Sequence, residues 1–179
     1  METLDAKWAR LASLTLRGLV AKKGVSYPQL AAALSDKGIK ESWRSVEGKI
    51  QRGGYSFAFF LQCATAMRAD CPDSWEALLK SAPTWTEAAT AIFNHEMSKV
   101  AGMNVAVLGQ RLAWIGVPIP ATSLEADICS GGMTFKLFLQ SAAVLPISGI
   151  AGFVDASDLR TLAAEGISES KAAASLPSD

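Results

Sequence analysis

The sequence is poor in the residues from which disulfide frameworks, metal centres and most catalytic sites are built. Its three cysteines, Cys63, Cys71 and Cys129, are an odd set without CxxC spacing, which argues against a disulfide framework and a zinc site. His95 is the only histidine, and no cysteine or cluster of acids accompanies it along the sequence. We therefore expect a protein that is not an enzyme and that uses neither a metal nor a cofactor.

Long apolar runs are missing as well. No stretch of about 18 uninterrupted apolar residues exists, as a membrane-spanning helix would need. The first ten residues carry charges where a secretory signal would have its apolar stretch. Since 50% of all residues are nevertheless hydrophobic, the chain can bury a core. We expect a globular, cytoplasmic protein with no membrane contact.

A net charge is also absent, but the charges are unevenly distributed. Residues 1–70 hold 11 Lys and Arg against 6 Asp and Glu, whereas residues 71–179 hold 6 against 11. A basic half is a first indication of nucleic-acid binding, although such patches also occur on proteins that bind none.

What the sequence does contain is an internal duplication. Residues 24–64 recur without a gap as residues 102–142, and 14 of the 41 aligned positions are identical. The clearest match joins GGYSFAFFLQ at residues 53–62 to GGMTFKLFLQ at residues 131–140. The shared residues are mainly glycines and large apolar residues, which set turns and cores. Both copies are therefore expected to have the same fold.

Apolar periodicity and capping residues predict an all-α chain with four helices in each copy. In the first copy the helices are expected over about residues 5–23, 26–38 and 42–51, and a fourth follows Ser56. No β structure is indicated.

In the second copy, Thr84 and Thr134 are the expected caps of the first and fourth helices. Pro118 and Pro120 are expected to delay the third helix to about Thr122.

These elements predict two tandem four-helix repeats joined by a short helical connector, in which Ser74 is the expected helix cap. After the second repeat we expect a short helix over about residues 155–165 and then a disordered tail. The predicted boundaries are 1–70 for repeat 1, 71–83 for the connector, 84–150 for repeat 2 and 151–179 for the short helix and tail.

The first copy resembles the lambda-repressor-like helix-turn-helix family over about residues 10–68, and the second does so more weakly over 88–145. In that family a glycine precedes the second helix, Leu-Ala lies within it, a glycine forms the turn, and an aliphatic pair and a final Arg-Gly mark the recognition helix. The matching residues here are Gly24, Leu30, Ala31, Gly38, Val46, Ile50, Arg52 and Gly53.

The chain is also similar to a family of bacterial domains of unknown function that share a Lys-Ile-x-Arg-Gly ending followed by a Phe-rich helix. It departs from the helix-turn-helix pattern in one respect, because the stretch between Leu34 and Val46 is longer than the compact family turn. Each repeat is thus expected to be helix-turn-helix-like, with a recognition helix that is either displaced or differently angled relative to that of the family.

The resemblance implies a transcriptional regulator that binds double-stranded DNA, contacting phosphates and the major groove through the third helix of repeat 1. Arg44 is the leading candidate for a guanine contact, because its guanidinium matches the O6 and N7 acceptors. Lys22 and Lys23 would suit phosphates. The candidate DNA-binding residues are Lys37, Lys40, Ser42, Trp43, Arg44, Ser45, Lys49 and Arg52.

The second copy lacks all five cations of this set. Selection for DNA binding in one copy explains the contrast, and drift after duplication explains it too. The residues aligned with Lys37, Lys40, Arg44, Lys49 and Arg52 are Ile115, Pro118, Thr122, Asp127 and Ser130.

Repeat 2 instead gains apolar residues, from which we predict an interface formed by Trp114, Ile115, Ile119 and Met133. It would pack on repeat 1, on the C-terminal helix, or on another chain as a homodimer or protein partner. The alternative function is accordingly a protein-interaction or adaptor module. The two copies could also face opposite ways as a pseudo-dimer.

Overall fold

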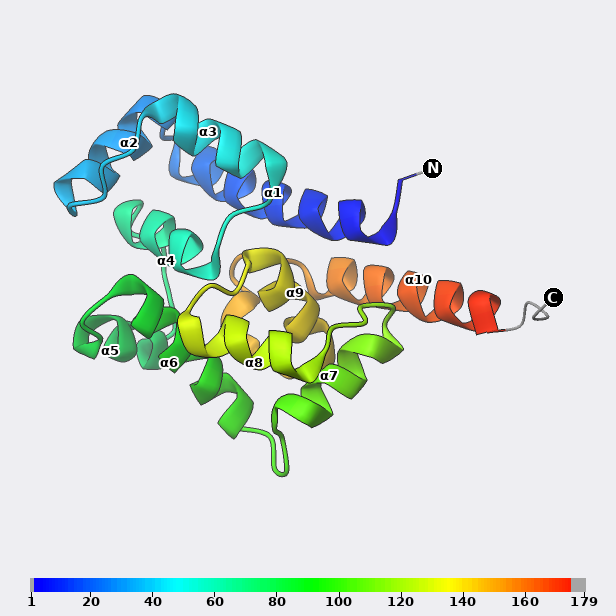
Figure 1. The fold of residues 1–179 in the computed structure, drawn as a ribbon. Coiled ribbons are helices and arrows are strands. Elements are labelled where there is room, and N and C mark those ends of the chain that lie inside the picture. The colour runs from blue at the N-terminus through cyan, green and yellow to red at the C-terminus, as the bar shows by residue number, and fades with distance from the viewer. Residues whose placement is uncertain (1, 175–179) are drawn as a thin grey trace.

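The computed structural model describes residues 2–174, and within this range all regular secondary structure is helical, as predicted, apart from an isolated β-bridge between Ser56 and Thr134 (Figure 1). The α-helices are α1 Leu4–Lys23, α2 Tyr27–Asp36, α3 Trp43–Arg52, α4 Phe57–Ala66, α5 Asp73–Ser81, α6 Trp85–Ser98, α7 Val105–Trp114, α8 Ala121–Ser130, α9 Phe135–Val144 and α10 Ala156–Ala174. A short 3₁₀ helix covers Ser148–Ile150. None of the helices described is both long and apolar enough to cross a membrane.

The helices keep the register of the duplication. α2, α3 and α4 recur 78 residues later as α7, α8 and α9, with the same length of 10 residues each. The prediction of two tandem repeats is confirmed. The expected delay of α8 is wrong, since Pro120 is its N-cap residue and α8 starts in the same register as α3. A proline is tolerated at this boundary because no intrahelical partner needs its missing N–H.

Local capping explains most of the helix boundaries. Ser26 caps α2 and forms a capping box with Gln29, and Ser56 caps α4. Gly53 and Gly131 end α3 and α8 in the left-handed conformation, each with φ of 66°. A Cβ on either glycine would also collide with a backbone carbonyl of the first helix of its repeat. The glycines are therefore required both for the turn and for close helix packing.

Two expectations about the connecting segments are wrong. α5 lies in the stretch expected as the connector, but its N-cap residue is Pro72, and Ser74 lies inside the helix. α10 extends to Ala174, well beyond the short helix expected over 155–165. An ion pair of 2.5 Å between Lys7 and Glu165 attaches it to α1, and its alanine-rich end has a high helix propensity. The rest of the expected disordered tail, residues 175–179, lies outside the described residues.

The two repeats meet about an approximate two-fold axis. The backbone N–H of Phe57 donates to the carbonyl oxygen of Met133 at 2.8 Å. The N–H of Phe135 donates to the carbonyl oxygen of Tyr55 at 2.9 Å. When each residue is replaced by its counterpart 78 positions away in the other repeat, one of these hydrogen bonds becomes the other. The contact is isologous, as between the subunits of a symmetric dimer, so the chain is an intramolecular pseudo-dimer.

Four phenylalanines stack across this axis. The rings of Phe57 and Phe138 have centroids 3.9 Å apart, and the equivalent pair, Phe60 and Phe135, lies at 4.1 Å. All four side chains are fully buried. The aromatic residues that the two copies share thus form the centre of one common core.

The symmetry extends beyond the aligned residues. Trp75 of α5 contacts Phe138 edge-on at 5.8 Å, and Phe153, 78 residues later, contacts Phe60 edge-on at 5.1 Å. The connector and the segment before α10 therefore occupy equivalent places. A single Trp-to-Phe match in otherwise dissimilar sequence does not reveal this correspondence.

The first helix of each repeat packs against both repeats. α1 lies on α3 and on α9 of the other repeat, while α6 lies on α8 and on α4 of the other repeat. α10 lies beside α1 and covers α9 (Figure 1). Buried side chains of both repeats belong to one continuous hydrophobic cluster. The two repeats therefore share their core.

We expect Phe138→Ala to destabilise both repeats together. The side chain is fully buried, so its loss should lower the free energy of unfolding by about 3–5 kcal/mol in urea titrations. Hydrogen exchange should show protection falling in repeats 1 and 2 alike, because the core is common. Trp114→Ala is the control, because this side chain is 66% exposed, and its effect should stay within about 0.5 kcal/mol. Unfolding of repeat 2 alone would contradict the shared core.

Candidate nucleic-acid interface

α3 and the loop before it form an exposed end of repeat 1. The helix buries Val46 and Ile50 and leaves its first turn open to solvent. Ser42 caps it, accepting a hydrogen bond from the Ser45 N–H at 3.2 Å. Trp43 lies in this turn with 41% of its surface exposed, an unusual state for a large aromatic residue. The N-terminus of α3 also carries the partial positive charge of the helix dipole.

Four of the predicted DNA-contacting cations are exposed around this helix: Lys37, Lys40, Arg44 and Arg52. The guanidinium of Arg44 lies over the Trp43 ring, 5.2 Å from its centroid. Such a cation–π contact stabilises one position of a long, flexible side chain. Arg44, the side chain predicted to contact guanine, is therefore held at the accessible N-terminal end of α3.

Lys49 differs from these four. Its ammonium is paired with the carboxylate of Glu41 and lies 5.1 Å from the centroid of the Phe59 ring. The other oxygen of Glu41 accepts a hydrogen bond of 2.9 Å from the Ser45 hydroxyl. Lys49 and Ser45 thus fasten the loop to α3, and a contact between Lys49 and DNA would require the Lys49–Glu41 pair to break.

Glu41 is the residue that sequence reasoning missed. The sequence offers Glu47 as a partner for Lys49, Arg44 or a helix end, but Glu47 accepts a hydrogen bond from Gln51 at 3.2 Å. The pair that forms joins residues eight positions apart across the helix cap, a spacing that no helical periodicity indicates. An acid directly before the N-cap Ser42 was the available signal.

The equivalent surface of repeat 2 offers no positive charge. α8 contains neither Lys nor Arg, and its exposed residues include Thr122, Ser123 and Glu125. Asp127 occupies the position of Lys49, and Ile119 that of Glu41. Both members of the Glu41–Lys49 ion pair are therefore replaced in repeat 2.

The predicted interface of repeat 2 is largely internal. Ile115 and Met133 are each 2% exposed, and Ile119 is half-buried against the core. Met133 lies at the pseudo-two-fold axis. Ile115 lies under α10, where a Cβ on Gly166 would be 1.9 Å from its carbonyl oxygen. Of the expected alternatives, Met133 therefore packs at the contact with repeat 1 and Ile115 on the C-terminal helix, and neither is available to another chain. Trp114 alone remains well exposed.

The thiols of Cys63 and Cys71 are poorly suited to nucleophilic chemistry. Burial raises the pKa of Cys63 and raises that of Cys71 to about 11, so both are protonated at neutral pH. Among residues 2–174, no three His, Cys, Asp or Glu side chains are grouped so that they could hold a metal ion.

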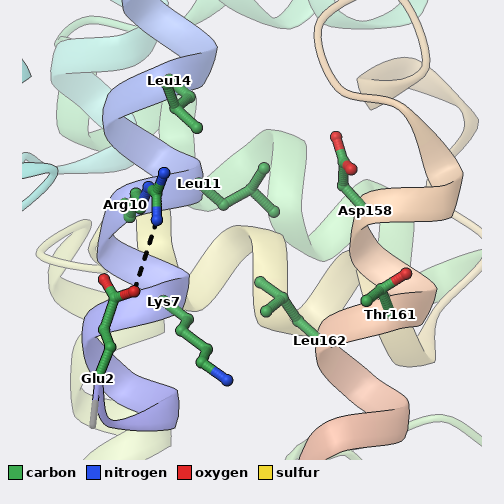
Figure 2. A pocket seen from close by; sticks show the side chains of 8 residues that line it. All are labelled: Glu2, Lys7, Arg10, Leu11, Leu14, Asp158, Thr161 and Leu162. Atoms are coloured by element: carbon green, nitrogen blue, oxygen red, sulfur yellow. Dashed lines mark ion pairs between the residues drawn. The ribbon is translucent and has the colours of Figure 1, made fainter.

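A groove of about 270 Å³ lies between α1 and α10 (Figure 2). Leu11 of α1 and Leu162 of α10 point toward one another across it, and Asp158 lies farther along α10. On α1, Arg10 is 3.6 Å from the carboxylate of Glu2. The groove was not foreseen because the packing of α10 beside α1 joins segments far apart in the sequence. Its charges are of both signs, so it adds no cationic surface to the α3 end.

Comparison with known families identifies the repeat unit. A family described as "Domain of unknown function (DUF6471)" matches the chain twice, at residues 8–71 and 85–150. No curated protein and no solved structure matches the chain. The double match confirms the tandem repeat, while the relation to the lambda-repressor-like family stays a prediction.

Gly48 is an unexpected residue for the middle of a helix. A Cβ at this position would meet only the guanidinium end of Arg52, at 3.0 Å, so no packing within the fold requires glycine. The aligned residue of α8 is Ala126. Glycine inside a helix is tolerated at a loss of stability, and one of its uses is to let another molecule approach the backbone closely.

We expect Gly48→Ala to stabilise the free protein by about 0.5–1 kcal/mol, because alanine has the higher helix propensity. Arg52 can move aside. Ala126→Gly, the matched change in repeat 2, should destabilise the protein by a similar amount. Thermal unfolding of the two variants measures both changes in stability. A loss of stability in Gly48→Ala would show that the fold itself needs this glycine.

Proposed function

The chain belongs to the family of domains of unknown function that matches it twice. From the surface of repeat 1 we propose that it binds double-stranded DNA as a transcriptional regulator. The contacts are made by α3 and the loop before it. The observation that carries the proposal is the exposed first turn of α3, where Arg44 stacks on Trp43 beside the loop cations.

The chemistry of this end suits duplex DNA. The major groove admits an α-helix, and side chains at the N-terminal end of the helix reach base edges. Arg44 would donate to guanine O6 and N7 from its position over Trp43. Lys37, Lys40 and Arg52 would contact phosphates on either side. Without a side chain at Gly48, the middle of α3 could come close to the DNA.

The comparison between repeats supports the same proposal. α3 and α8 have the same length and register, so the cations of α3 are not needed to build the helix. The change of Lys49 to Asp127 accompanies the loss of Glu41 and has a structural explanation. The change of Lys37 to Ile115 has one too, because Ile115 is buried under α10. The replacements of Lys40, Arg44 and Arg52 have no such explanation within the fold. A function of repeat 1 that repeat 2 does not perform accounts for them.

Arg44→Glu and Thr122→Glu test the proposal at aligned positions, both exposed. Arg44→Glu should weaken binding to a duplex selected from random DNA by at least about tenfold, because one bidentate base contact contributes about 1–3 kcal/mol. Thr122→Glu should leave the affinity unchanged, although it adds a negative charge at the matched site. Circular dichroism should show the same helix content in both.

Salt provides an independent check on this proposal. Contacts between cations and phosphates release counterions, so the affinity of the unmodified chain should fall steeply as salt rises. Binding that is insensitive to salt, or no binding to any random duplex, would contradict DNA recognition.

A second candidate function rests on Trp114, whose side chain is 66% exposed at the end of α7. Exposed aromatic residues are enriched in protein interfaces. If repeat 2 docks on another protein or a second copy, Trp114→Asp should abolish the complex without changing DNA affinity. Ile115 is unsuitable for this test because it is buried. A strictly monomeric protein that copurifies with no partner would count against this candidate.

A further inference from the structure

The backbone of this chain has the symmetry of a dimeric repressor. In such proteins two recognition helices related by a two-fold axis each contact one half of an inverted repeat in the DNA. Here the reciprocal hydrogen bonds of Phe57 with Met133 and of Phe135 with Tyr55 define a comparable axis. α3 and α8 are equivalent about it. The fold taken alone would thus predict an inverted-repeat site.

The surface of repeat 2 does not follow that symmetry. Residues 115–130, from the end of α7 through α8, contain no Lys or Arg. A phosphate that approached α8 would meet the carboxylates of Glu125 and Asp127 without any cation from the same helix. Counterion release, which supplies much of the affinity for DNA, would be missing there.

The cations of repeat 1 cannot substitute at α8. Figure 1 shows α2 and α3 along the upper edge of the molecule and α7 and α8 below, with α1 and α9 between them. α3 packs on α1 and α2, and α8 packs on α6 and α7. The two equivalent helices are therefore separate surfaces, of which one is basic and the other is not.

We propose that one chain recognises a single, non-palindromic half-site of duplex DNA, with α3 as the only recognition helix. The inference rests on the proposed function and specifies its substrate. Repeat 2 acts as the scaffold, since its α9 supports α1 and its phenylalanines complete the core of repeat 1.

The salt dependence of binding differs between one and two recognition helices. The logarithm of the affinity falls with the logarithm of salt concentration by about 0.9 for each phosphate neutralised. The three cations assigned to phosphates, Lys37, Lys40 and Arg52, would give a slope of about −3. Two equivalent helices would give about −5.

Selection of binding sites from random duplexes by the full chain is the direct experiment. We expect a motif without an internal dyad, one chain bound per selected duplex in a titration, and a salt slope of about −3. Arg44→Glu should reduce the affinity and Thr122→Glu should not.

An inverted-repeat motif, together with weakening by Thr122→Glu, would overturn the single half-site while leaving DNA binding intact. Two chains bound side by side on a palindrome would overturn it in the same way. Failure to enrich any duplex would overturn the proposed function and this inference together.

Discussion

The stack of four phenylalanines at the pseudo-two-fold axis is the contact on which the rest of the structure depends. Phe57 and Phe60 of one repeat are interleaved with Phe135 and Phe138 of the other. Around them, each first helix packs on the fourth helix of the opposite repeat. Neither repeat closes a core by itself, so the stability of each half depends on the presence of the other. Repeat 2 is therefore retained for folding whether or not it binds anything.

Because the core constrains the backbone of both repeats equally, their surfaces are free to differ. α3 and α8 then act as an internal comparison in which length and register are constant and exposed side chains vary. The comparison distinguishes two kinds of change. Glu41 and Lys49 were replaced together as a pair that fastens the loop to α3, whereas Arg44 and Trp43, which contact each other on the exposed surface, were replaced by Thr122 and Ala121. Only the second kind bears on ligand binding.

The sequence predicted what depends on local interactions. The caps at Ser26 and Ser56 are determined by neighbouring backbone groups, and they were correctly predicted, whereas the end of the third helix was expected at Gly53 or Gly54 and lies at Gly53. Burial of Ile115 and Met133 depends on α10 and on the other repeat, so hydrophobicity alone could not distinguish an exposed interface from an internal one. The length of α10 and the partner of Lys49 likewise depend on contacts between segments distant in sequence or on opposite sides of a helix cap.

The connector α5 joins the two halves of this pseudo-dimer through a covalent bond where a dimeric protein would rely on association. A dimer dissociates on dilution, and its stability cannot be separated from its concentration. Here the two halves remain at a fixed, high effective concentration. The assembled fold should therefore persist even where a cell holds only a few molecules of it, and no second chain has to be found before the surface of α3 is complete.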